Sequence, residues 1–152
     1  RVHGQNKRYH YKHIGMGGRL DTIQAAILLA KLPHYKKELA ERDRVAKNYS
    51  YTLKGSLKLP IIKSNRTSVW AQYTVRINNR DKVQKKLQDK GIPTAIYYPV
   101  SLHLQECFRY LNYKENDFPI AEEASSSVLS LPMNAYLTDD NISYITKTLN
   151  DI

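Results

Sequence analysis

Cysteine is almost absent from this chain of 152 residues, in which Cys107 stands alone. A single cysteine excludes an internal disulfide and any metal site built from several cysteines. No apolar run reaches the roughly eighteen residues that a membrane-spanning helix needs. The amino end is basic and aromatic, unlike a signal peptide. These absences favour a soluble, unprocessed domain, for which a reducing cytoplasm is the simplest location.

Acidic side chains are the second shortage. The chain has 24 lysines and arginines against 14 aspartates and glutamates, a formal net charge of +10, and its first twenty residues contain no acid. We therefore expect an anionic partner. A nucleic acid is one candidate, because the 12 tyrosines can stack on bases. A small phosphorylated ligand is another, because it needs only a local cluster of donors. Scattered solvated lysines account for part of the excess charge.

The stretch from Ile14 to Leu32 passes directly from a glycine-rich loop into an apolar helix. Its glycines are Gly15, Gly17 and Gly18. They predict positive φ angles, or the close approach of a ligand or of a second backbone. Arg19 follows them and offers a planar fork of donors for phosphate or carboxylate. The next residues, 22–32, predict a helix that is apolar on nearly every side and is therefore buried against more than its own small domain. A glycine turn before an ordinary core helix is the simpler alternative.

Hydrophobic periodicity predicts the remaining elements. These are a loop over 1–13, a helix from Pro33 to Gly55, a strand over 69–77, a helix from Asp81 to Gly91, a strand over 92–98, a short helix over 102–111, a helix over 119–128 and a last helix opening at Thr138. The sum is an α+β fold, an α/β sandwich with a small, mainly antiparallel sheet and about five helices. It divides into a loop and helix over 1–32, a connecting helix over 33–56 and a small domain over 57–152.

Residues that could carry chemistry are few. A self-sufficient enzyme needs a nucleophile with its base, a carboxylate pair or a cofactor anchor, and none is evident. Three histidines near the amino end lack the cysteines, carboxylates and spacing of a metal site. Cys107 falls in an amphipathic segment, where a buried and inert thiol is the simpler interpretation. The remaining candidates are binding residues: Arg19, Tyr97, Tyr98 and His103. The last three also fit a plain aromatic cluster at a strand end.

Three motifs occur in order along the chain: YHYKHIGMGGRLDTIQAAILLAKL, GIPTAIYYPVSLHLQECF and DFPIAEEASSSVLSLPMN. Together they resemble the carboxyl-terminal part of the DegT/StrS-type sugar aminotransferases, which are pyridoxal-phosphate enzymes of the aspartate-aminotransferase fold. The resemblance covers essentially the whole chain and implies the small domain of a fold type I aminotransferase. The residues of the first motif are most similar to those of transaminases that aminate a keto group on a UDP-linked sugar or sugar acid for surface-polysaccharide synthesis.

The resemblance implies roles for individual residues. Gly17, Gly18 and Arg19 would approach the phosphate of pyridoxal 5'-phosphate across a homodimer interface. Many relatives carry asparagine at the place of Gly17 and use its amide on the cofactor phosphate, so here that contact would either be made by a backbone N–H or be lost. Arg19, Tyr97, Tyr98 and His103 would line the site of the UDP-sugar.

The resemblance also implies what lies elsewhere. In the family the Schiff-base lysine lies upstream, so this chain alone is expected to be inactive. The implied amino donor is glutamate. The resemblance implies no metal site and no binding to nucleic acid or to a membrane. A basic nucleic-acid-binding domain and a non-catalytic regulator of the same family remain as alternatives.

Overall fold

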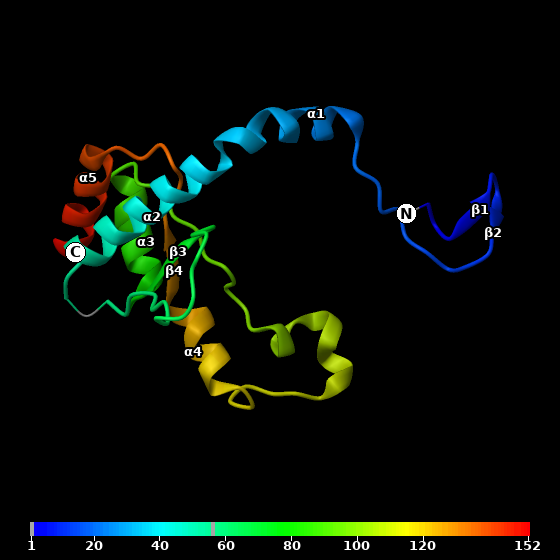
Figure 1. Cartoon of the computed structure of the whole chain (residues 1–152). Coiled ribbons are helices and arrows are strands. Elements are labelled where there is room, and N and C mark those ends of the chain that lie inside the picture. The colour runs from blue at the N-terminus through cyan, green and yellow to red at the C-terminus, as the bar shows by residue number, and fades with distance from the viewer. Residues whose placement is uncertain (1, 56) are drawn as a thin grey trace. The chain divides into compact units, whose positions relative to one another are not determined.

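The computed structural model describes residues 2–55 and 57–152. These residues belong to two compact units, Arg1–Lys37 and Glu38–Ile152. In chain order the first unit contains β1 (Gln5–Lys7), β2 (His10–Tyr11), α1 (Thr22–Lys31) and the 3₁₀ turn η1 (Leu32–His34). Helix α2 (Tyr35–Thr52) begins there and continues into the second unit (Figure 1). The second unit adds β3 (Tyr73–Arg76), α3 (Arg80–Asp89), η2 (Leu102–Leu104), η3 (Glu106–Leu111), α4 (Pro119–Ser127), β4 (Val128–Leu131) and α5 (Asp139–Asn150).

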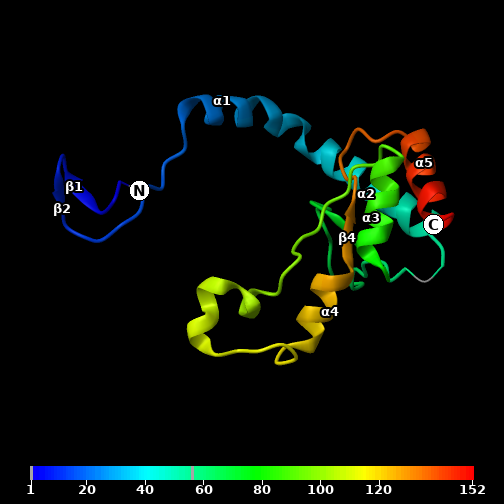
Figure 2. The same ribbon diagram turned by 180° about the vertical axis from the view of Figure 1, so that it is seen from behind.

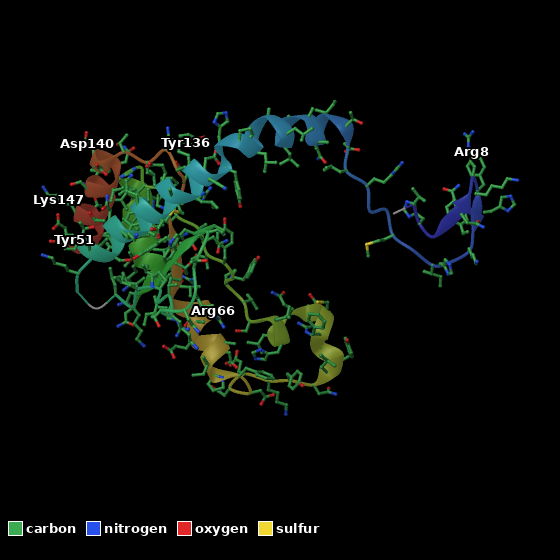
Figure 3. All side chains as sticks on the ribbon, in the orientation of Figure 1. Arg8, Tyr51, Arg66, Tyr136, Asp140 and Lys147 are labelled. Carbon is green, nitrogen blue, oxygen red and sulfur yellow. The ribbon has the colours of Figure 1, made fainter. Side chains whose placement is uncertain are left out.

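The amino-terminal segment forms a short hairpin where the sequence predicts a loop. Strands β1 and β2 pair antiparallel, with an irregular register between them. Tyr9 turns the chain with φ 64°. The guanidinium of Arg8 lies 5.0 Å from the centroid of the Tyr9 ring, and Figure 3 shows Arg8 at this hairpin. The loop prediction is wrong because strands of three and two residues are too short to give a period-two signal.

The glycines of the first unit allow two segments of backbone to approach closely. A Cβ on Gly15 would lie 2.5 Å from the backbone nitrogen of Gly4, and one on Gly17 would lie 3.1 Å from the ring of His3. The predicted close approach of a second backbone is therefore confirmed. The predicted positive φ is wrong for Gly15, Gly17 and Gly18, since the glycine with positive φ in this unit is Gly4, at 79°.

Helix α1 buries none of its residues. Its exposed apolar side chains include Ile23, Ile27, Leu28 and Leu29. Ile23 is 76% exposed and Leu29 is 70% exposed, so apolar surface lies on more than one face of the helix. The helix begins after Asp21, which has the extended backbone of an N-cap residue, although its side chain caps nothing.

The second unit is built on an antiparallel pair of strands. β3 and β4 run in register from Tyr73 opposite Leu131 to Arg76 opposite Val128. On the other edge of β4, Ser130 pairs with Ala95 through an isolated bridge. The outline is that of a small antiparallel sheet with helices α2, α3 and α5 packed beside it (Figure 1, Figure 2). The α+β fold predicted from the sequence is confirmed.

Alternate residues of the two strands point into one hydrophobic core. The core contains Val45, Ala46, Tyr49, Leu53, Trp70, Tyr73, Val75, Val83, Leu87, Ile92, Leu129, Leu131, Ile142, Ile145 and Leu149. Tyr49 lies at its centre and donates its phenol hydrogen to the carbonyl of Pro132 at 2.9 Å. Burial raises the pKa of the Tyr49 phenol, so this donor stays protonated. Helices α2, α3 and α5 supply most of this core.

Trp70 closes one end of the core. It is 9% exposed, and its ring centroid lies 5.6 Å from that of Tyr73. Its indole N–H donates to a carboxylate oxygen of Asp43 at 3.2 Å. The pKa of Asp43 lies below its usual value, chiefly because of the hydrogen bond with Lys47 and also because of this indole. The loop before β3 is thereby fixed to α2.

Arg80 ties the start of α3 to the end of α4. It is 7% exposed, and its Nη1 donates to the carbonyls of Ser125 at 3.2 Å and Val128 at 3.1 Å. The sequence predicts Asp81 as the N-cap of this helix, but the N-cap is Asn79, with φ 52°. Asp81 instead lies in the first helical turn and pairs with Arg80. A buried guanidinium thus holds the junction between α4 and β4.

Several predicted boundaries differ from the structure. The strand predicted over 69–77 is limited to β3, and the strand predicted over 92–98 is reduced to the bridge at Ala95. The helix predicted over 119–128 ends at Ser127, and β4 follows it directly. The segment 102–111 forms two 3₁₀ turns, η2 and η3. The two strand predictions were too long because a segment with strand propensity forms a strand only where a neighbouring strand is available to pair with it.

Helix ends were predicted more accurately. Gly55 and Gly91 have φ angles of 86° and 72°, as expected for residues that follow helices. Thr138 caps α5 through a reciprocal capping box with Asn141.

No helix among the described residues is both long and apolar enough to cross a membrane.

Candidate functional site

Arg19 lies in the extended segment that precedes α1. It is exposed, and it forms no ion pair within residues 2–55 and 57–152. Gly17 and Gly18 stand directly before it, and the ring of His3 lies against Gly17, where a Cβ would come within 3.1 Å of that ring. An exposed guanidinium can bind phosphate. Gly17, Gly18 and Arg19 belong to the first unit, whereas the other predicted binding residues belong to the second.

Tyr97 and Tyr98 lie together on the surface of the second unit. Their ring centroids are 5.9 Å apart and the rings meet edge to face. Tyr97 is 45% exposed and Tyr98 is 74% exposed, so both phenols are accessible to a ligand. A phenol can both donate and accept a hydrogen bond, which suits sugar hydroxyls and phosphate oxygens.

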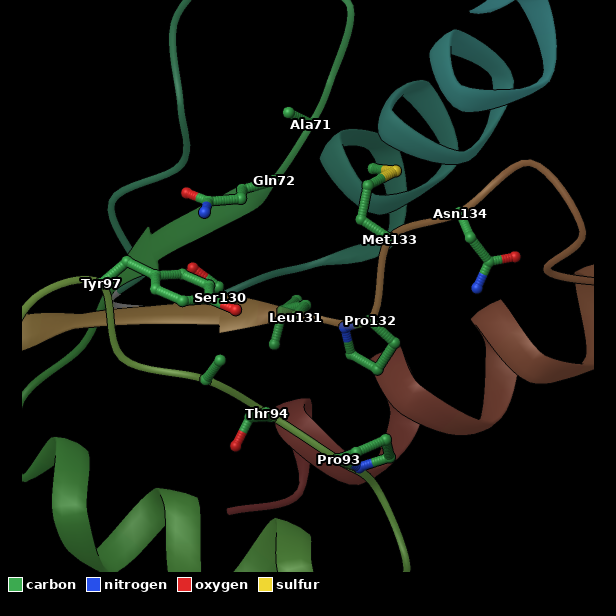
Figure 4. A pocket seen from close by; sticks show the side chains of 11 residues that line it. Ala71, Gln72, Pro93, Thr94, Tyr97, Ser130, Leu131, Pro132, Met133 and Asn134 are labelled. Carbon is green, nitrogen blue, oxygen red and sulfur yellow. The ribbon is translucent and has the colours of Figure 1, made fainter. Parts of the chain in front are cut away.

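Tyr97 lines a hollow of about 380 Å³ beside the end of β4. Figure 4 shows its ring next to Ser130, with Gln72 on one side and Met133 and Asn134 further along. The other polar side chain is that of Thr94. None of the residues that line this hollow is charged. Amides and hydroxyls around apolar walls can bind a neutral, polyhydroxylated ring.

His103 lines a different hollow, of about 340 Å³. Its other walls are apolar or aromatic: Leu102, Phe108, Leu111, Tyr113, Phe118 and Ala121. The side chain of His103 is 8% exposed, and its Nε2 lies 3.1 Å from a carboxylate oxygen of Glu122. The structure therefore brings Tyr97 and Tyr98 together but places His103 in its own aromatic surroundings.

Glu122 is a residue of this site that the sequence analysis missed. Its carboxylate accepts hydrogen bonds from the backbone N–H groups of Asn116 and Phe118 as well as facing His103. The Asn116 N–H is the largest cause of a pKa below the usual glutamate value. An acid in the first turn after Pro119, where helical N–H groups lack partners, was the available signal.

Cys107 is exposed, and the prediction of a buried thiol is wrong. It lies in η3, a 3₁₀ segment that buries none of its residues. The thiol of Cys107 is therefore accessible to solvent and is not part of the hydrophobic core. Among the residues that the structure describes, no group of three or more histidine, cysteine, aspartate or glutamate side chains is arranged to hold a metal ion.

Comparison with known proteins accounts for the arrangement of these elements. Residues 1–150 match the DegT/DnrJ/EryC1/StrS aminotransferase family. The chain belongs to this family. The resemblance noted in the three sequence motifs is therefore confirmed. Enzymes of the DegT/DnrJ/EryC1/StrS family are pyridoxal-phosphate-dependent sugar aminotransferases.

The chain is similar in sequence and in structure to individual members of this family. The chain is 43% identical over 150 residues to a UDP-2-acetamido-2-deoxy-3-oxo-D-glucuronate aminotransferase of Pseudomonas aeruginosa, covering 98% of this chain and 41% of that protein. It is 39% identical over 153 residues to a pleiotropic regulatory protein of Geobacillus stearothermophilus, again covering 98% and 41%. The crystal structure of S. venezuelae DesV in complex with a ketimine intermediate matches with a TM-score of 0.90 at 30% identity, covering 98% of this chain and 41% of DesV.

The chain thus spans about two fifths of the length of the DegT/DnrJ/EryC1/StrS proteins that it matches. Arg19 fits one part of the family's cofactor, its phosphate, because its guanidinium is exposed and forms no ion pair among the described residues. The neutral hollow beside Tyr97 does not offer a cation for a phosphate.

Proposed function

We propose that this chain is the carboxyl-terminal part of an aminotransferase that moves an amino group to a keto sugar carried on UDP, for surface-polysaccharide or lipopolysaccharide synthesis. The observation that carries the proposal is the 43% identity, over nearly the whole chain, to an aminotransferase whose substrate is a UDP-linked 3-oxo sugar acid. Family membership disfavours the alternative of a basic nucleic-acid-binding domain.

Pyridoxal 5'-phosphate supplies the chemistry when bound, since it acts as an electron sink during amino transfer. Gly17, Gly18 and Arg19 bind its phosphate from across a homodimer interface, and Arg19 also meets the nucleotide sugar. Tyr97 and Tyr98 hydrogen-bond the substrate, and His103 completes that site. The amino donor is glutamate. The dimer works in the cytoplasm, where nucleotide sugars are made.

The proposal assigns a place to each part of the chain. Residues 1–32 belong to the interface with a large domain and with the second subunit. Residues 33–56 form the helix that connects this segment to the small domain, which is formed by residues 57–152. The exposed apolar surface of α1 supports this division, because a helix with no buried residue has apolar area left for another surface. The Schiff-base lysine lies upstream in this proposal, so the chain alone has no transaminase activity.

The test uses a protein that joins this chain to the upstream portion found in its relatives. Incubation with pyridoxal phosphate, glutamate and a UDP-linked 3-keto sugar is expected to give the aminated sugar, detected by mass spectrometry. The 152-residue chain alone should give none. Product formed by the chain alone would contradict the upstream placement of the lysine.

A second test concerns Arg19. Arg19→Ala should weaken binding of cofactor or substrate by about 10- to 150-fold, the loss of one charge-assisted hydrogen bond. Arg66→Ala is the matched control, because Arg66 is exposed and the one hydrogen bond of its side chain in the described chain goes to the neighbouring carbonyl of Asn65. If Arg19→Ala unfolds the protein, Arg19 is structural and its binding role is wrong.

A non-catalytic regulator is the second candidate function, favoured by the 39% identity to a pleiotropic regulatory protein. The same incubation separates the two. A longer protein that binds the nucleotide sugar but transfers no amino group from any common amino acid would support the regulator.

A further inference from the structure

Glu122 and His103 form a partly buried pair between α4 and η2. The side chain of His103 is 8% exposed and that of Glu122 is 19% exposed. The Nε2 atom of His103 and Oε1 of Glu122 are 3.1 Å apart. Water therefore competes less for this hydrogen bond than it would for one on the open surface.

The Glu122 carboxylate is held in place by backbone donors as well. Asn116 N donates to Oε1 at 3.0 Å and to Oε2 at 2.9 Å, and Phe118 N donates to Oε1 at 3.2 Å. These bonds favour the ionised form, and the pKa of Glu122 is accordingly lowered. An ionised carboxylate can only accept hydrogen bonds. The hydrogen between the two side chains therefore sits on Nε2 of His103.

Two aromatic rings fix the plane of the imidazole. The centroid of the Phe118 ring lies 4.7 Å from that of His103, at an interplanar angle of 57°. The Tyr113 ring meets His103 edge to face at 6.4 Å and meets Phe118 at 5.1 Å. The imidazole is thus oriented by one carboxylate and two rings, all from the segment 113–122.

We propose that Glu122 is a positioning residue for substrate binding: it fixes the tautomer and the ring plane of His103, so that Nδ1 is the ring nitrogen left to meet the nucleotide sugar. This inference rests on the proposed function, in which His103 lines the substrate site. With the hydrogen on Nε2, a neutral imidazole offers Nδ1 as an acceptor, which suits a sugar hydroxyl. No hydrogen bond to Nδ1 is formed within the part of the chain that the structure describes.

The coupling between the two side chains can be tested on this chain alone. We expect a ring N–H resonance of His103 in ¹H–¹⁵N spectra, assigned to Nε2 and protected from exchange. Glu122→Gln keeps the size of the side chain but removes its charge, so this resonance should move upfield or be lost to exchange. Glu123→Gln is the matched control, because Glu123 is the next residue of α4 and its salt bridges are with Lys58 and Arg76. An unchanged His103 signal in Glu122→Gln would overturn the proposal.

The consequence for binding is tested in the longer protein described above. Glu122→Gln should raise KM for the UDP-linked keto sugar by about tenfold, as expected for a weakened hydrogen bond. It should change kcat by less than about threefold and leave amino transfer from glutamate to the cofactor unaffected. Glu122→Asp, which retains the charge on a shorter side chain, should recover part of the loss. Glu123→Gln should behave as the wild type.

The outcomes separate this inference from the proposed function. If the wild-type longer protein aminates no nucleotide sugar, the proposed function fails, and the spectra of the chain still decide whether Glu122 orients His103. If the wild type is active but Glu122→Gln has an unchanged KM, or loses both half-reactions equally, Glu122 does not position a substrate-binding residue.

Discussion

Helices α1 and α5 contain ten and twelve residues and both carry several isoleucines and leucines, yet they are buried very differently. Helix α5 buries Ile142, Ile145 and Leu149 on one face, whereas α1 buries nothing. In α5 the opposite face is polar and the helix begins at a capping box. In α1 apolar side chains point in several directions, and none of the described residues of its unit belongs to the hydrophobic core. Apolar residues on one side predict a helix whose apolar face is buried within one domain. Apolar residues on every side predict a helix that must pack against further partners to bury its surface.

The largest effect expected from this contrast is on stability. Leu129→Ala removes a fully buried side chain from the second unit and should cost about 2–5 kcal/mol. Leu29→Ala in α1, whose side chain is exposed, should change the free energy of unfolding by less than about 0.5 kcal/mol. Urea unfolding followed by circular dichroism measures both. Equal losses would mean that α1 is packed in solution.

The second effect is on association. Because α1 exposes its isoleucines and leucines, we expect the chain to self-associate at tens of micromolar. The double variant Ile23→Lys and Ile27→Lys should shift it toward monomer in sedimentation velocity. Ile61→Lys, at an exposed position of the second unit, is the control and should change little. A wild-type chain that is already a monodisperse monomer would refute the expectation.

The third expected effect concerns the side-chain cap at the start of α5, which has no counterpart at the start of α1. Thr138 accepts the backbone N–H of Asn141 and caps α5, a contact that Asp21 does not make for α1. Thr138→Ala should therefore destabilise the second unit by about 1 kcal/mol, within a range of roughly 0.5–2. Thr148→Ala is the control, since its hydroxyl only bonds back to the carbonyl of Tyr144 within the helix. Thermal unfolding of the two variants should differ by this amount.

The smallest effect is a local response to acid. The folded-state pKa of Glu122 is lowered, first by the N–H of Asn116, so its contribution to stability is complete above the unfolded pKa and is lost as the pH falls through the folded value. The amide signals of Asn116 and Phe118 should therefore shift with a midpoint below 4.5, the ordinary glutamate value. In Glu122→Gln both signals should stay constant over this range. A wild-type midpoint above 4.5 would contradict the assignment.

The sequence predicted features that depend on a few neighbouring residues. The glycines after α2 and α3 and the cap at Thr138 were foreseen because each is a local backbone requirement. The presence of helices at α3 and α5 was predicted from hydrophobic periodicity. Family membership was also accessible, because the three motifs are long.

Features that depend on distant residues were not foreseen. Strand β4 was not predicted, and its first residue, Val128, was placed at the end of a helix, because Val128 to Leu131 become a strand only beside β3 and Ala95. The role of Glu122 depends on His103, which lies nineteen residues away in the sequence. The exposure of Cys107 was not foreseen, because the amphipathic pattern predicted an inner face for this segment, whereas η3 buries none of its residues.

Trp70 has an optical consequence. It is the one tryptophan in the sequence, and it lies in the core of the second unit with its indole N–H donating to Asp43. Its emission will therefore report the loss of that core, and it will be blind to any event confined to the first unit. Tyr9 and Tyr11 give the first unit its own weaker chromophores. Most of the 12 tyrosines lie in the second unit, however, so selective excitation of Trp70 is the way to follow one unit alone.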